Sequence, residues 1–335
     1  MSTNAHRDVF VGKVVDEHSV SDPFTDDDPT IPLAAPMPNG TWVSVEVREG
    51  VGHARLLAEP RTALAAMYAI AARHRLDPTY PPAALEEAAA WEADPGIDDP
   101  SLVDLTHLPF ISIDEETSKD LDQALFIDGD DQGYTVWYAV ADAAWFVRPG
   151  SALFAEAMRR AATFYLPGLV VPMLPRSLSE GLVSLNPGVD RRALVFEVRL
   201  DLAGKVVRTE IHRGRVRSRV KTWYDAVQAY MDGKIPVPGG DPAVAESLAR
   251  LREVGELRME AADSRDVVAI RRAEVAVSLA GQAGLRFVAM ADPRNAVEHY
   301  NEQISLLCNI EGARYLRRNA QDDTHVQPVY RVHDP

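Results

Sequence analysis

The segment 113–127 constrains the fold most, because a dense set of acids leads directly into an apolar run. The acids come first, and the apolar residues that follow them are Ala124, Leu125, Phe126 and Ile127. An apolar run of this length, bounded by polar residues, predicts a buried strand. Charged side chains are unfavourable beside a core unless something compensates them. The fold must therefore accommodate several carboxylates at the start of one core strand.

Three aspartates of this segment have a spacing that suits metal binding. If Asp120 and Asp122 begin the strand, both carboxylates lie on one face while Leu121 points to the other, and Asp114 can fold back across the intervening loop. Carboxylates held this close repel one another unless a hard cation joins them, and oxygen ligands suit Mg²⁺ or Mn²⁺. Such an ion would activate water beside a phosphate. The alternative is a solvated acidic turn, which an isolated Asp-x-Asp pattern by itself favours.

Length, charge and cysteine content limit which binding partners and which cellular compartment we expect for this chain. A length of 335 residues predicts one large domain and a smaller module, and the net charge of −15 argues against a protein that coats duplex DNA. Any nucleic-acid site must be local. The single cysteine, Cys308, excludes an intramolecular disulfide and cysteine-based zinc sites. We find no export signal and no apolar stretch of about 18 residues, so we expect a cytoplasmic, monomeric protein without a membrane span.

The chain divides near residue 100, where Asp, Pro and Gly are concentrated in the segment 94–100. Residues 1–40 are rich in Asp, Pro and Ser, which predicts a flexible acidic arm. Residues 41–100 predict a small mixed α/β module, a candidate for RNA binding. Its expected elements are a strand at 41–47 and helices at 61–75 and 83–93.

Residues 101–335 alternate between strand-like and helix-like patterns, which predicts an α+β or mixed α/β domain. A late helix at 295–318 should bury one face, because its apolar residues recur at spacings of three and four. That face comprises Val297, Tyr300, Ile304, Leu307, Cys308 and Glu311. The other expected elements are strands near 122–128, 134–142, 193–201 and 205–220, and helices near 151–162, 222–231 and 242–262.

A basic stripe lies on the strand expected at 205–220 and just beyond it. Its alternating members are Arg213, Arg215, Arg217, Arg219 and Lys221. In an extended chain these five cations share one face, where they could contact RNA phosphates. A solvated face whose charges offset the surrounding acids explains the pattern equally well.

Several short motifs resemble, in order, those of the RNB-type exoribonucleases, the ribonuclease II and ribonuclease R family. The resemblance covers about residues 105–335 and leaves the first hundred residues unmatched. The matching segments are Phe110 to Asp114, Lys119 to Asp122, Ala139 to Asp142, Val147 to Ser151, Tyr165 to Gly168, Val171 to Pro175 and Ser184 to Arg191.

This resemblance implies processive 3′→5′ hydrolysis of single-stranded RNA to nucleoside 5′-monophosphates by a two-metal mechanism with Mg²⁺, or alternatively Mn²⁺. Asp114, Asp120 and Asp122 would be the catalytic and metal-binding carboxylates, with Gln123 as a further metal ligand. Tyr165 matches a position where an aromatic ring stacks on a base. Glu302 and Asn309 match polar residues near the family's RNA channel, although an ordinary polar helix face explains them slightly better.

The sequence departs from the family pattern at three places. Gln123 stands where the family commonly has another aspartate, and a glutamine supplies a neutral oxygen without the charge. Residues 266–272 lack an expected second aromatic residue, and the chain ends before the arginine-bearing helices and basic barrel that the family would lead us to expect. The domain is therefore expected to be incomplete. The first two departures leave a second hypothesis open, an RNB-fold protein that binds RNA without cleaving it.

Overall fold

The computed structural model describes residues 7–263, 275–281, 285–291 and 293–319, which form two compact units. The first unit comprises Met1–Ala93, Phe146–Ser179 and Ala273–Pro293, and the second comprises Asp94–Trp145, Glu180–Arg272 and Arg294–Pro335. Both units contain helices and strands, so the expected α+β class is confirmed. The region expected to lack a second aromatic residue, 266–272, lies outside the described residues.

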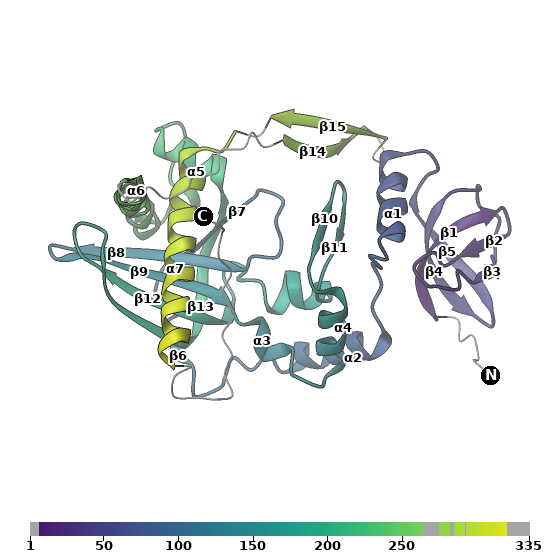
Figure 1. Ribbon diagram of the computed structural model, residues 1–335, viewed down its shortest axis with the longest axis horizontal. Helices are drawn as coiled ribbons and strands as arrows, with labels where there is room; N and C mark the ends of the chain where they lie inside the picture. The colour runs from purple at the N-terminus through teal and green to yellow at the C-terminus, as the bar shows by residue number, and fades with distance from the viewer. Residues whose placement is uncertain (1–6, 264–274, 282–284, 292, 320–335) are drawn as a thin grey trace. The chain divides into compact units, whose positions relative to one another are not determined.

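The first unit begins with a five-stranded antiparallel sheet in the order β3-β2-β1-β4-β5, drawn in purple and blue in Figure 1. A bridge between Leu33 and Gly52 brings the chain after β3 to β5, the opposite edge strand. Phe10, Val14 and Val43 are buried between the strands. The strands are β1 (Val9–Asp16), β2 (Ser19–Ser21), β3 (Thr30–Pro32), β4 (Trp42–Arg48) and β5 (Val51–Ala58).

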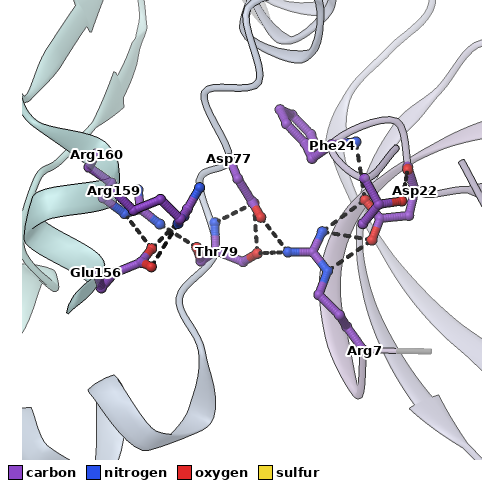
Figure 2. Close-up of polar contacts among 9 residues, drawn as sticks. Arg7, Asp22, Phe24, Asp77, Thr79, Glu156, Arg159 and Arg160 are labelled. Atoms are coloured by element: carbon purple, nitrogen blue, oxygen red, sulfur yellow. Dashed lines mark hydrogen bonds and ion pairs between the residues drawn. The ribbon is translucent and has the colours of Figure 1, made fainter. Parts of the chain in front are cut away.

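The expectation of a flexible arm over residues 1–40 is wrong for the described residues 7–40, because three of the five strands come from this segment. Most of its large apolar residues are buried, although Val9 and Val15 are exposed, and a polar network holds its beginning in place (Figure 2). Arg7 donates two hydrogen bonds of 2.7 and 2.8 Å to the buried carboxylate of Asp22 and also contacts Asp77. On the far side of this network, Arg160 donates to the carbonyl of Thr79.

In the remainder of the first unit, α1 and the β10–β11 hairpin pack on this sheet, α2 contacts α4, and the β14–β15 hairpin contacts α1. Trp42 of β4 stacks on Tyr68 of α1 with ring centroids 5.5 Å apart, and Leu169 of β11 joins the same core. Thr62 caps α1 by accepting a hydrogen bond from the amide of Ala65. The elements are α1 (Ala63–Arg73), α2 (Pro82–Ala93), α4 (Ala152–Arg160), β10 (Phe164–Leu166), β11 (Leu169–Val171), β14 (Val275–Ala280) and β15 (Arg286–Ala291).

The second unit is built on a six-stranded sheet in the order β12-β9-β8-β7-β13-β6. The 18-residue strand β13 pairs with β12 through residues 206–217 and with β7 from Ser218 onward, and a register shift between Ser218 and Val220 interrupts the pairing with β7. The sheet therefore closes on itself. The strands are β6 (Val103–Asp104), β7 (Phe110–Asp114), β8 (Gln123–Asp130), β9 (Gly133–Ala141), β12 (Asp190–Leu200) and β13 (Val206–Trp223).

Three helices cover one face of this sheet (Figure 1): α5 (Tyr224–Met231), α6 (Pro242–Asp263) and α7 (Ala296–Asn319). The buried face of α7 is the one expected from the sequence, from Val297 to Glu311. The opposite face of the sheet holds a smaller core that includes Phe126, Val195 and Val216. Short elements complete the chain: α3 (Ala143–Phe146), a π-helical turn at Ser177–Leu182 and a 3₁₀ turn at Pro238–Gly240. Among the described helices, none combines the length and apolar character needed to cross a membrane.

Candidate active site

The acid-rich segment lies between two neighbouring strands of the second unit. Asp114 is the last residue of β7, Gln123 is the first residue of β8, and Asp120 and Asp122 lie in the irregular stretch between them. The strand therefore starts just after the two aspartates that were expected to begin it. Asp114 and Asp120 are half-buried and Asp122 is exposed. The fold thus presents the carboxylates at one end of a core strand, where solutes can reach them.

Ser184 fixes the backbone of this segment around Asp120. Its buried hydroxyl donates to the carbonyl of Lys119 at 2.8 Å and accepts from the amide of Leu121 at 2.9 Å. The next residue, Leu185, donates its amide to the carbonyl of Leu121. Backbone on both sides of Asp120 is therefore hydrogen-bonded to the segment 184–185, which gives that sequence motif a structural role at the site.

Lys221 holds the preceding part of the loop. Its ammonium group donates to the carbonyl of Glu116 at 2.8 Å and also to the carbonyl of Ser118. Asp114 closes the same turn, because its Oδ1 accepts from the Glu115 amide at 2.7 Å and from the Ser118 hydroxyl at 3.0 Å. The loop that joins Asp114 to Asp120 is therefore held by a cation and by local hydrogen bonds.

The site concentrates negative charge at Asp122. Its pKa is raised to about 6, first because protein atoms surround the carboxylate on one side, although the residue also has exposed surface, and then because Asp120 and Asp114 repel its charge. Burial also raises the pKa of Tyr224 to about 12, and the charge of Asp114 adds to this effect. Both shifts favour the neutral form of the group, and a cation bound beside Asp122 would lower its pKa again.

The donor set suits a hard divalent cation, because three carboxylates and the amide oxygen of Gln123 are all oxygen ligands. In the described part of the chain, the group of at least three potential ligands whose atoms all lie within 4.8 Å of one another is Glu197, Glu210 and His212. The three aspartates are spaced more widely than this. Binding would therefore require more than one ion or a rotation of the carboxylates.

Gln123 is held by a neighbour that the sequence did not single out. The Tyr138 hydroxyl of β9 donates to Gln123 Oε1, and burial raises the pKa of Tyr138. One lone pair of the amide oxygen is therefore already used, while the other can still reach a cation. The tyrosine therefore fixes the orientation of the Gln123 amide.

The basic stripe of β13 is engaged mainly with protein groups. Arg215 pairs with Asp104 at 2.6 Å, Arg217 pairs with Asp190 at 2.6 Å, and Arg219 donates to the carbonyl of His107. These contacts support the reading in which the cations offset surrounding acids. Arg213 is exposed.

The remaining expected RNA contacts come from both units. Tyr165 is on β10 of the first unit and is 65% exposed. Glu302 lies on α7 and forms an ion pair with Arg294, with a nitrogen–oxygen distance of 3.3 Å. Asn309 of the same helix is exposed. Neither residue of α7 contributes to the charge effects at Asp122.

Comparison with known proteins places the chain in a family. Residues 102–335 match the family model described as the RNB domain. Ribonuclease R of Vibrio parahaemolyticus is 32% identical over 235 residues, which are 69% of this chain and 27% of that protein. Ribonuclease R of Escherichia coli is 28% identical over 253 residues, 75% of this chain and 30% of the relative. The chain therefore spans less than a third of the length of these two relatives.

Solved structures agree at the level of the fold. Mycoplasma genitalium RNase R in complex with ribose-methylated single-stranded RNA matches with a TM-score of 0.73 at 21% identity, covering 93% of this chain and 52% of that one. Yeast Ssd1, a pseudonuclease, matches with a TM-score of 0.55 at 13% identity, covering 94% of this chain and 41% of the other. The family match extends over more than two thirds of the chain and includes the whole carboxylate segment. The protein therefore belongs to the RNB domain family.

Proposed function

We propose that the protein is a metal-dependent exoribonuclease that hydrolyses single-stranded RNA from its 3′ end and releases nucleoside 5′-monophosphates. The observation that carries this proposal is the set of three aspartates at an accessible strand end, where burial and then the charges of Asp120 and Asp114 raise the pKa of Asp122. The relatives are named ribonuclease R, and one matching structure contains single-stranded RNA. Membership of the RNB family makes phosphodiester hydrolysis the chemistry that this site supports best.

In this proposal Asp114, Asp120 and Asp122 hold Mg²⁺, with Mn²⁺ as a substitute, and Gln123 contributes a neutral oxygen. The bound ions would activate water and stabilise the charge that develops on the phosphate, by a two-metal mechanism. Ser184 and Lys221 keep the aspartate backbone in place, so little reordering is needed when RNA arrives.

RNA binding would be local, because the chain is acidic overall. Tyr165 offers an exposed ring on which a base can stack irrespective of sequence. Arg213, Arg215 and Arg217 would contact phosphates and exchange some of their ion pairs with Asp104 and Asp190. Glu302 and Asn309 would contact the strand through polar groups of α7.

The test uses RNA labelled at its 5′ end and incubated with the protein and Mg²⁺. We expect stepwise shortening from the 3′ end and loss of at least about a thousandfold in rate for Asp122→Asn, since a metal ligand and a transition-state charge partner are both lost. Asp128→Asn is the matched control, because Asp128 is an exposed aspartate on β8 outside the cluster. No shortening by the wild type, or equal rates for Asp122→Asn and wild type, would overturn the proposal.

A second candidate function is RNA binding without cleavage. It is favoured by Gln123, which leaves the cluster one carboxylate short, and the fold of the pseudonuclease Ssd1 gives it a structural counterpart. This candidate predicts RNA binding by the wild type with no shortening in Mg²⁺ or Mn²⁺, and appearance of cleavage in Gln123→Asp. Cleavage by the wild type would exclude it.

A further inference from the structure

A second group of potential metal ligands lies on the sheet of the second unit, apart from the aspartates. Glu197 of β12 and Glu210 of β13 are directly opposite each other in the antiparallel register. His212 is two residues beyond Glu210 on the same strand, so its side chain lies on the same face. All three side chains are partly exposed, at 33%, 39% and 23% respectively, and are therefore accessible to a solute.

The distances within this group suit one small ion. His212 Nε2 is 3.0 Å from Glu197 Oε2 and 3.8 Å from Glu210 Oε2. Ligand atoms at the usual zinc distances of about 2.0–2.2 Å are separated by roughly 3.3 Å in a tetrahedral site, so the observed values bracket the required spacing. Small side-chain rotations would complete the arrangement without movement of the strands.

The surroundings hold the imidazole in place and set the two carboxylates opposite each other. The ring of Trp137 lies nearly parallel to that of His212, with centroids 6.4 Å apart and an interplanar angle of 27°. Like charges directly opposite on neighbouring strands are unfavourable, and the groups beside the two carboxylates are Arg208 at Glu210 and the His212 ring at Glu197. A divalent cation between the two carboxylates would remove this repulsion.

The group is separate from the aspartate site. Glu197 is in register with Trp137, and Trp137 is in register with Phe126. Phe126 is four residues from Asp122, which corresponds to roughly 13 Å along the strand. An ion held by His212 would therefore not share ligands with an ion held by Asp122.

We propose that Glu197, Glu210 and His212 form a second metal site, which takes a transition metal of the zinc type and leaves one coordination position open. An imidazole with two carboxylates suits Zn²⁺ better than Mg²⁺, which prefers an octahedral set of oxygens. The ion would link β12 to β13 close to the turn that connects the two strands. Three protein ligands leave a fourth position for water or another donor.

The test is calorimetric titration of the whole protein with Zn²⁺ in a large excess of Mg²⁺, together with the absorption spectrum of the Co²⁺-substituted protein. We expect one Zn²⁺ per chain and the intense visible bands of four-coordinate Co²⁺. Affinity should fall at least about tenfold in both His212→Asn and Glu197→Gln, because each removes a direct ligand.

Two controls separate this site from the alternatives. His53 lies opposite Glu46 on β5 and β4, a cross-strand pair with a single carboxylate, so His53→Asn should leave Zn²⁺ binding unchanged. Asp122→Asn should also leave it unchanged. Circular dichroism of His212→Asn and Glu197→Gln shows whether each variant is folded, and Zn²⁺ should raise the melting temperature of the wild type. Absence of Zn²⁺ binding, equal binding by a folded His212→Asn variant, or loss only in Asp122→Asn would overturn the proposal.

Discussion

The molecule places acidic side chains in two contrasting environments. In the first unit Asp22 and Asp77 are almost fully buried and both contact Arg7 (Figure 2). In the second unit Asp122 reaches solvent. Its pKa is raised by partial burial and by the charges of two further carboxylates, and none of the causes of the shift is a cation. Burial raises the pKa of Asp22 as well, but there the arginine opposes the effect.

The contrast distinguishes acids that stabilise the fold from acids that are available for a ligand. A buried carboxylate with its own arginine is satisfied within the protein and has no remaining demand for a cation. A cluster whose members repel one another is stabilised when a cation arrives from solution. The two regions should therefore respond in opposite ways when a charge is removed.

The largest effect is expected in the first unit. Arg7→Ala should lower the free energy of unfolding by about 3 kcal/mol, because Asp22 and Asp77 would be left buried without their cation. Denaturant unfolding measures this loss. Arg48→Ala is the matched control, since its pair with Glu46 is exposed on both sides and should contribute less than about 1 kcal/mol. Equal losses of unfolding free energy in the two variants would show that the Arg7 network stabilises the fold no more than an exposed ion pair does.

In the second unit, Lys221 donates hydrogen bonds to backbone carbonyls and not to a carboxylate. Lys221→Met should reduce the rate of RNA cleavage by about 10- to 100-fold, because Asp114 and Asp120 lose the donor that fixes the loop between them. The Mg²⁺ concentration required for half-maximal rate should rise, while the melting temperature changes little. Lys234→Met, on an exposed turn, serves as the control. An unchanged Mg²⁺ dependence in Lys221→Met would refute this positioning role.

The sequence predicted the elements whose residues carry a clear period. The alternation along β13 from Arg213 to Arg219 and the stripe from Val297 to Glu311 on α7 both appear in the structure, but the register shift between Ser218 and Val220 interrupts the alternation before Lys221. The start of β8 was also predicted to within one residue. These features depend on neighbours in the chain, so local pattern is sufficient to locate them.

The sequence did not predict features that depend on distant pairing. Strands β2 and β3 have three residues each and lie among aspartates and prolines, so they are recognisable only through the partners on which they pair. Lys221 contacts carbonyls 103 and 105 residues away because β13 runs beside β7. Periodicity placed Lys221 on a basic stripe but could not show which strand would lie beside it.

A smaller effect is expected from restoring the missing charge. Gln123→Asp should increase the affinity for Mg²⁺ by about tenfold, because a charged ligand replaces a neutral one. The Tyr138 hydroxyl can donate to a carboxylate as it does to the amide, so the variant should fold normally. Calorimetry with Mg²⁺ measures the change, with Gln132→Asp on the exposed β8–β9 turn as the control. If Gln123→Asp binds no more tightly than wild type, Gln123 is not a ligand.

The smallest effect concerns the metal-free protein and has the opposite sign to that at Arg7. The pKa of Asp122 rises from 3.8 to about 6 on folding, so the folded state holds its proton more tightly than the unfolded state does. This contribution to stability is present below pH 3.8 and is lost as the pH rises to about 6. Because the side chain is exposed, we expect a loss of no more than about 1 kcal/mol.

Asp122→Asn should remove the loss of stability that ionisation of Asp122 causes. In the presence of a metal chelator, the variant should therefore be slightly more stable than wild type at neutral pH and no more stable at low pH. Unfolding curves at a series of pH values test this, and Asp128→Asn should follow the wild type. Added Mg²⁺ should reverse the order at neutral pH, because the ion binds the charged cluster and only the wild type retains it in full. A variant that is less stable than wild type without metal would mean that Asp122, like Asp22, is satisfied within the fold.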